Sequence, residues 1–254
     1  MLKKIYTLIE KPYLFISATA SIVSVVLLCF NNLLASLIAV SCLCIALAVL
    51  TGALLRAIFK YTKLTNKTDY RRIATFIEYK TNTNNAEIVE FQSYRIVQIK
   101  TPILKSIDVV YKWSGTSNPQ ITSDLQVIEE IVEDIDRPHG YTKARLTLPQ
   151  PKLYNETAVF HHKITANDAD HSSDTKVEMK IEEPIDLVRV NISLGYKPDN
   201  YNGTARIERS AIVHDAPPAY ELLDLIHFDP ILKEFTCTLK YPEPGYFYKI
   251  SWER

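Results

Sequence analysis

The sequence YLFISATASIVSVVLLCF at residues 13–30 is followed, after Asn31 and Asn32, by a second apolar run, LLASLIAVSCLCIALAVLTGALL at residues 33–55. Neither run holds a charged side chain. Each is close to the ~20 residues that an α-helix needs to cross a bilayer core about 30 Å thick. One continuous helix would be far too long for that core, and the first run is longer than the core of a cleaved signal peptide. We therefore expect a two-helix transmembrane hairpin that turns at Asn31-Asn32.

The charged residues beside the two runs indicate the orientation of this hairpin. Lys11 precedes the first run, Arg56, Lys60 and Lys63 follow the second, and the turn between the runs has no Lys or Arg. Because positively charged flanks stay on the cytoplasmic side, we expect both termini in the cytoplasm. These four residues are then expected at the membrane interface.

The distribution of charge also divides the chain into two expected domains. Residues 1–67 hold seven Lys or Arg and one Glu, so residues 68–254 carry a net charge of −6. We expect a hairpin domain with basic flanks over 1–67, with the lipid bilayer as its partner, and a cytosolic domain over 68–254. An acidic cytosolic domain lacks the positive surface of a duplex-DNA-binding protein, so duplex nucleic acid is not an expected partner.

Small and hydroxyl side chains form a stripe on each expected helix. The spacing of three or four residues places each set on one helix face. The candidates for a pore lining or a helix contact are Ser17, Ser21 and Ser24 in the first run and Ser41, Cys44 and Thr51 in the second. One interpretation is close packing within the hairpin. The other is an oligomer contact or the lining of a weakly polar pore.

Residues 68–254 show short runs of β-branched and aromatic residues between turn signals, which predicts about eleven strands and no βαβ unit. The expected strands are 72–79, 87–99, 107–113, 125–135, 141–148, 157–165, 175–182, 186–194, 205–210, 235–241 and 246–252. Strand 125–135 also fits a helical pattern, and a short helix is expected at Glu221–His227. Pro242–Gly245 is expected to close a final hairpin. We expect an all-β domain, with a β-sandwich as the first interpretation and a barrel as the second.

Few residues of the sequence are candidates for a metal site or a catalytic site. The segment Asn167–Asp174 gathers carboxylates and an imidazole, but it lacks the Gly and the terminal Glu of an EF-hand, so a solvated loop is the preferred interpretation. His161 and His162 are adjacent in an expected strand and should face opposite sides. Nucleophile-elbow, Walker A, dinucleotide-binding, zincin and CxxC motifs are absent from the sequence. We expect no enzyme activity, no catalytic residues, no metal and no cofactor.

Aromatic residues beside cations are the remaining indication of a ligand site. Lys112 and Trp113 lie near one strand end, and Lys249 and Trp252 lie in the last expected strand. Such pairs can stack on a base and contact a phosphate. The alternative is that the aromatic residues pack in the core or on a sheet.

The architecture resembles that of bacterial anti-phage membrane effectors, and the two-transmembrane β-strand-rich CBASS effectors are the nearest such family. The second domain is similar to a recurrent bacterial β domain. The residues that carry this second resemblance are Tyr111–Gly115, Leu148–Pro151 with Glu156-Thr157, and Pro244–Tyr246 leading to Ile250–Trp252. The resemblance implies an inner-membrane homo-oligomer whose β domain senses a nucleotide signal from a neighbouring nucleotidyltransferase, or a protein partner. It implies that the hairpins then form a pore that depolarises the membrane. The alternative is a membrane-tethered scaffold that conducts nothing.

Overall fold

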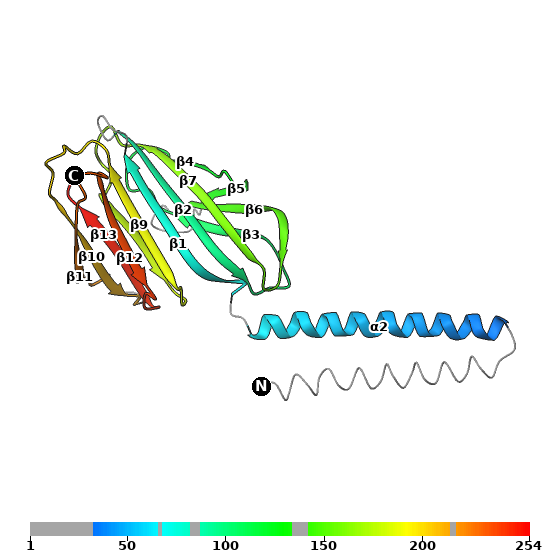
Figure 1. Cartoon of the computed structure of the whole chain (residues 1–254). Helices are drawn as coiled ribbons and strands as arrows, with labels where there is room; N and C mark the ends of the chain where they lie inside the picture. Colours follow the sequence, from blue (N-terminus) through cyan, green and yellow to red (C-terminus); the bar gives the residue numbers. More distant parts are fainter. Residues whose placement is uncertain (1–32, 66–67, 82–86, 134–141, 214–216) are drawn as a thin grey trace. The chain divides into compact units, whose positions relative to one another are not determined.

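The computed structural model describes residues 33–65, 68–81, 87–133, 142–213 and 217–254. The chain divides into two compact units between residues 65 and 66. In the described residues the first unit contains one apolar helix, and the second is built of β-strands (Figure 1). The prediction of a β-rich second part is therefore confirmed, while the first apolar run, residues 13–30, lies outside the described residues.

Helix α2, Leu33–Thr65, holds a stretch from Val40 to Ile58 that is long and apolar enough to cross a membrane by length and composition. On the predicted stripe, Ser41 Oγ donates a hydrogen bond to the carbonyl oxygen of Leu37 at 2.9 Å, and Thr51 Oγ1 donates one to the carbonyl of Leu47 at 2.8 Å. These two hydroxyl groups are therefore satisfied within their own helix. Cys44, Arg56 and Lys60 are exposed on α2. The side chains of Ser17, Ser21, Ser24, Lys11 and Lys63 lie outside the described part.

The larger sheet of the β unit has six strands in the order β12-β9-β1-β2-β7-β4. Their bounds are β1 Tyr70–Thr81, β2 Ile88–Ile99, β4 Gln120–Thr122, β7 Thr157–Asn167, β9 Leu187–Leu194 and β12 Glu234–Lys240. All neighbouring strands pair antiparallel except β1 and β9, which are parallel. The sheet thus joins segments from the start, the middle and the end of the β unit.

Two smaller sheets complete the unit, with orders β11-β10-β13-β8 and β3-β6-β5. Their bounds are β3 Ile103–Tyr111, β5 Val127–Glu133, β6 Thr142–Leu153, β8 Lys176–Ile181, β10 Thr204–Ala211, β11 Glu221–His227 and β13 Tyr246–Trp252. The expected strand at 125–135 is confirmed as β5, which pairs with β6.

Both smaller sheets pack on one face of the six-stranded sheet. One core cluster joins residues of β1, β9 and β12 to residues of β8, β10 and β13. A second cluster joins β2, β4 and β7 to β3 and β6. The alternation of buried and exposed side chains along these strands places one apolar face inward. The result is a layered arrangement with two neighbouring cores, and Phe91 packs against both of them.

Two local predictions were wrong. Glu221–His227 is strand β11, not a helix, because it pairs antiparallel with β10 and its Glu221 forms an ion pair with Arg209 of that strand. The turn Pro242–Gly245 does not close a hairpin. β12 pairs with β9, whereas β13 pairs with β10 and β8. The turn crosses between layers because both strands present buried residues to the same core from opposite sides.

Candidate functional site

Polar side chains interrupt the apolar inner face of the six-stranded sheet. Thr75 on β1 stands directly opposite Arg95 on β2, and Ser93 on β2 stands opposite His162 on β7. Thr75, Ser93 and His162 are buried, and residues of the same parity farther along β2, such as Val89 and Val97, are apolar core residues. Because burying polar groups is unfavourable unless they find partners, this polar set marks a place where the layers do not close on each other.

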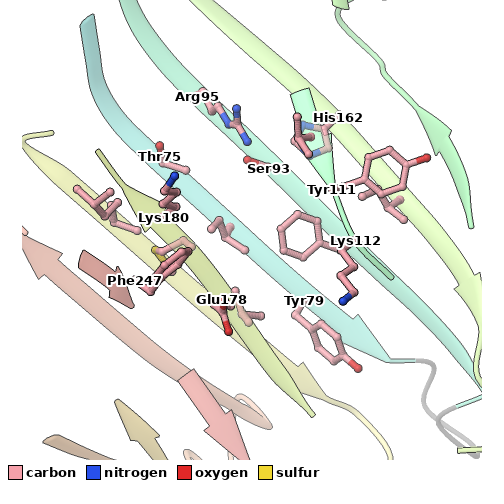
Figure 2. A pocket seen from close by; sticks show the side chains of 18 of the residues that line it. Thr75, Tyr79, Ser93, Arg95, Tyr111, Lys112, His162, Glu178, Lys180 and Phe247 are labelled. Carbon is pink, nitrogen blue, oxygen red and sulfur yellow. The ribbon is translucent and has the colours of Figure 1, made fainter. Parts of the chain in front are cut away.

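A cavity of about 1310 Å³ lies over this polar set. Its floor is the inner face of β1, β2 and β7. Its walls are the edge strands β3 and β8 of the two smaller sheets, the segment from Lys112 to Ser114, and Phe247 of β13. Figure 2 shows Arg95 and Ser93 on one strand of the floor, between Thr75 and His162 on the neighbouring strands. The cavity therefore occupies the seam between the two cores.

Arg95 is the central charge of the cavity floor. Among the described residues it makes no ion pair and no hydrogen bond. Burial lowers the pKa of its guanidinium, Tyr70 acts in the opposite direction, and the positive charge of Arg72, another lining residue, lowers the pKa further. An arginine stays protonated in proteins despite such shifts. The floor thus carries a positive charge that forms no ion pair with a carboxylate among the described residues.

Two further polar groups on the floor suit hydrogen bonding to a ligand. The Thr75 hydroxyl is buried and has no hydrogen-bond partner in the structure. Burial, followed by the charge of Arg95 and by His161, lowers the pKa of His162 to about 3. His162 is therefore neutral at physiological pH, with one ring nitrogen that donates and one that accepts. Its ring lies 6.1 Å from that of Phe91, centroid to centroid.

Three of the acidic residues on the cavity walls, Asp108, Asp174 and Glu182, are engaged by cations. The side chain of Asp108 bonds Lys143 at 2.7 Å and Arg145 at 3.0 Å, and these bonds lower the pKa of its carboxyl group. Asp174 pairs with Lys176, and Glu182 pairs with Lys180. The lining also holds Asp69, Glu178 and Glu183, of which Glu183 accepts a hydrogen bond from Thr68 and Glu178 accepts one from Tyr220. The walls thus carry acidic groups, whereas the two arginines lie on the floor.

Of the four predicted ligand residues, two border the cavity. Lys112 and Trp113 belong to the segment that follows β3 and line one wall. Trp113 packs on the first core cluster, whereas the preceding Tyr111 packs on the second. This segment thus crosses the seam. The indole Nε1 of Trp113 is buried and has no hydrogen-bond partner in the structure.

The other two predicted ligand residues lie outside this cavity and do not form a pair. Lys249 and Trp252 have opposite parity on β13 and face opposite sides of its sheet. Lys249 Nζ lies 2.8 Å from Glu208 Oε2 and 3.8 Å from the centroid of the Tyr220 ring. Trp252 packs in the core, edge-to-face on Tyr79, with ring centroids 4.9 Å apart.

The adjacent histidines face opposite sides of the sheet, as predicted. His162 lines the cavity, whereas the His161 ring stacks on Tyr94 at 4.3 Å and accepts a hydrogen bond from the backbone of Asp124. The acidic loop after β7 is tied down by hydrogen bonds, among them those from Ser173 to the buried carboxylate of Asp168. Within the described residues, no group of three His, Cys, Asp or Glu side chains is arranged to hold a metal ion.

Sequence reasoning missed Thr75, Ser93 and Arg95. A signal was present on β2, where Ser93 and Arg95 interrupt a series of inward residues that is otherwise apolar, from Val89 and Phe91 to Val97 and Ile99. The polar interruption of an apolar strand face indicates a site or a cavity, because a closed core would leave the guanidinium without partners.

No protein-family model and no curated protein matches the chain. Among solved structures, the chain is similar to an M1 zinc metallopeptidase from Deinococcus radiodurans, with 12% identity, 72% of this chain and 42% of that chain covered, and a TM-score of 0.36. A putative protease from Parabacteroides distasonis gives 9% identity, 72% and 40% coverage and a TM-score of 0.40. Baculovirus P35 gives 7% identity, 74% and 99% coverage and a TM-score of 0.36. Likenesses at this level carry no argument about function.

Proposed function

We propose that the protein is a membrane effector whose β unit binds a small ligand in the cavity and thereby controls an oligomeric transmembrane pore. The proposal places it in bacterial anti-phage defence, at the inner membrane, with the ligand a nucleotide made by a neighbouring nucleotidyltransferase. The resemblance of its architecture to two-transmembrane β-strand-rich effectors supports this role. The observation that carries the ligand-binding part is the cavity with an uncompensated arginine on its floor.

The chemistry of the cavity suits a nucleotide. Its volume of about 1310 Å³ is larger than the roughly 300–1,000 Å³ that is common for small-molecule sites, so a ligand as large as a nucleotide has room to enter. Arg95 offers a charge for an anionic group, and Phe91, Tyr111 and Trp113 offer aromatic surface around the same space. Bases stack on aromatic side chains, and guanidinium groups bind phosphates.

The connection between the cavity and the apolar helix supports a switching role. Only residues 66–69 separate α2 from β1, and β1 carries Arg72 and Thr75 on the cavity floor. The end of this connection is fixed, because the carbonyl of Asp69 accepts hydrogen bonds from the backbone N–H groups of Lys100 and Thr101. A ligand that binds one arrangement of the sheets more tightly than another would shift the populations of the two arrangements. We propose that β1 would transmit this change in sheet arrangement to the helix.

The test uses the full chain reconstituted in liposomes and a panel of mono-, di- and cyclic nucleotides. We expect at least one nucleotide to cause release of trapped potassium, reported by a potassium-sensitive dye outside the liposomes. Ser93→Trp should abolish release because the indole fills the cavity above the floor. Thr236→Trp, at an exposed position of β12, is the matched control and should release potassium like the wild type. Absence of release with every nucleotide, or equal release from Ser93→Trp, would contradict the proposal.

A test in cells addresses the defence role. The chain is expressed with and without its genomic neighbours, and membrane potential is followed during phage infection. We expect depolarisation only when a nucleotide-producing neighbour is present. Unchanged polarisation in every combination would remove the effector role.

The second candidate function is a tethered binding protein without a pore. It is favoured by the hydroxyl groups of Ser41 and Thr51, which are bonded to carbonyls of their own helix and so offer less polarity to a conducting path. Replacing residues 1–65 by an unrelated transmembrane hairpin separates the two functions. Retained phage protection supports the tether, and lost protection with an intact β unit supports the pore.

A further inference from the structure

We propose that the floor of the cavity is a phosphoryl-binding subsite formed by Arg95, Arg72 and the Thr75 hydroxyl. This inference rests on the proposed function in that it names the chemical group by which a ligand is held in the same cavity. The group is a tetrahedral oxyanion, and the three residues named above are the ones that bind it.

The register of the sheet brings the three groups together. Thr75 pairs with Arg95 across β1 and β2, and Arg72 pairs with Val97, the next inward residue of β2 after Arg95. A β-bulge between Arg72 and Ala74 shifts the register there, so that Arg72 and Thr75 both line the cavity although they are three residues apart. Such bulges re-aim side chains next to functional sites.

The charges on the floor need a counter-ion. Two guanidinium groups close enough to affect each other's protonation repel each other, and among the described residues neither makes an ion pair. Both arginines are partly buried, and an unpaired charge that is partly removed from water is unfavourable. Of the acidic wall residues, Asp108, Asp174 and Glu182 are paired with lysines or arginines other than Arg72 and Arg95, and none of the remaining three, Asp69, Glu178 and Glu183, makes an ion pair with either floor arginine among the described residues. An anion that enters the cavity would therefore meet two arginines whose charges are still available.

The number and kind of donors favour a phosphoryl group over a carboxylate. One guanidinium satisfies a planar carboxylate with two parallel hydrogen bonds. The floor offers two guanidinium groups and a hydroxyl that has no partner in the structure. A phosphoryl group presents three oxygens in different directions and up to two negative charges. His162, which is neutral, lies beside them and offers a further donor.

The test measures binding of inorganic phosphate to the full chain in a maltoside detergent, which carries no phosphate of its own. Calorimetry gives the dissociation constants for phosphate and for acetate. We expect the wild type to bind phosphate more tightly than acetate. Arg95→Gln should weaken phosphate binding by about 10- to 100-fold, as expected for loss of charged hydrogen bonds. Arg72→Gln should also weaken it.

Arg71→Gln is the matched control, because Arg71 neighbours Arg72 in the chain but is exposed and paired with Asp186. It should bind phosphate like the wild type, and thermal unfolding checks that each variant is folded. Absence of phosphate binding in the wild type, or equal affinity in folded Arg95→Gln, would overturn the subsite.

A second arm compares adenosine 5′-monophosphate with adenosine. Tighter binding of the monophosphate that is lost in Arg95→Gln supports the subsite, and equal binding of the two overturns it. Failure of the proposed function has a different signature, since phosphate would bind at Arg95 while no nucleotide caused potassium release from liposomes.

Discussion

Arg254 Nη2 lies 2.8 Å from Asp168 Oδ2, and the side chain of Asp168 is only 2% exposed. The same arginine nitrogen bonds the backbone carbonyl and the hydroxyl of Ser173, whose own N–H and hydroxyl groups donate to Asp168. The residues after β13 are thereby fixed to the loop after β7. This arrangement explains why an acidic loop that resembles a cation site in sequence serves as a structural joint.

Arg254→Ala is expected to destabilise the β unit because it leaves the buried Asp168 carboxylate without its cation. We expect the free energy of unfolding to fall by roughly 2–4 kcal/mol. Denaturant unfolding followed by tryptophan fluorescence measures it, since Trp113 and Trp252 are the two tryptophans of the chain and both lie in the β unit. Arg206→Ala is the control. It removes a cation that is 58% exposed beside Glu208 and should change stability by less than about 1 kcal/mol.

Removing the positive charge of Arg95 should stabilise the empty protein while it abolishes anion binding. In Arg95→Met the apolar chain stays in place and the uncompensated guanidinium is gone, so we expect the free energy of unfolding to rise by about 1–3 kcal/mol. Arg71→Met, at an exposed position, should leave stability nearly unchanged. A lower stability of Arg95→Met would indicate that the guanidinium is satisfied in the folded protein.

The stability of the β unit should fall in acid partly through His162. Its pKa drops from about 6.5 when unfolded to about 3 when folded, so the unfolded state binds a proton that the folded state does not. Stability is therefore fully present above about pH 6.5 and falls by up to about 1.4 kcal/mol per pH unit as the pH decreases toward 3. His161, whose pKa burial also lowers, acts in the same direction.

His162→Phe should reduce this pH dependence by about one proton between pH 6 and pH 4. Denaturant unfolding at a series of pH values gives the slope. His227→Phe replaces an exposed histidine on β11 and should keep the slope of the wild type. An unchanged slope in His162→Phe would show that the imidazole is protonated in the folded state.

The thiol of Cys237 should be unreactive until the protein unfolds. Cys237 is buried in the first core cluster, and burial raises the pKa of its thiol to about 11, so little thiolate forms at pH 8. In a variant whose other three cysteines are replaced by serine, we expect no alkylation by iodoacetamide at pH 8 in native conditions. Complete labelling should follow in denaturant. Rapid native labelling would show that this core opens readily.

Most of the strands could be predicted from the sequence because side chains alternate along them and turns separate them, but the three-residue strand β4 is not among the predicted ones. β11 could not be predicted, because Leu222, Leu223, Leu225 and Ile226 satisfy a helical pattern as well as a strand pattern. Only pairing with β10 decides between the two. Likewise, Pro242–Gly245 is a turn by its own residues, but whether the flanking strands pair depends on the sheets they join.

Only part of the cavity lining could be predicted from the sequence. Lys112 and Trp113 could be found because aromatic and cationic residues are adjacent in the chain. The floor could not, because the meeting of Thr75 with Arg95 and of Ser93 with His162 depends on the register between strands. Lys249 and Trp252 illustrate the reverse case, in which proximity in the chain places two side chains on opposite faces.

The parallel pairing of β1 with β9 has a consequence for biosynthesis. Ala74 pairs with Leu187, and Phe247 on β13 completes the cavity wall. A ribosome therefore releases α2 long before the six-stranded sheet can form, and the cavity is closed only when nearly all of the β unit has been translated. The floor strands and the walls β3 and β8 are made before β9, but Val188 and Phe247 also line the cavity, so a polypeptide stalled before β9 lacks part of the lining.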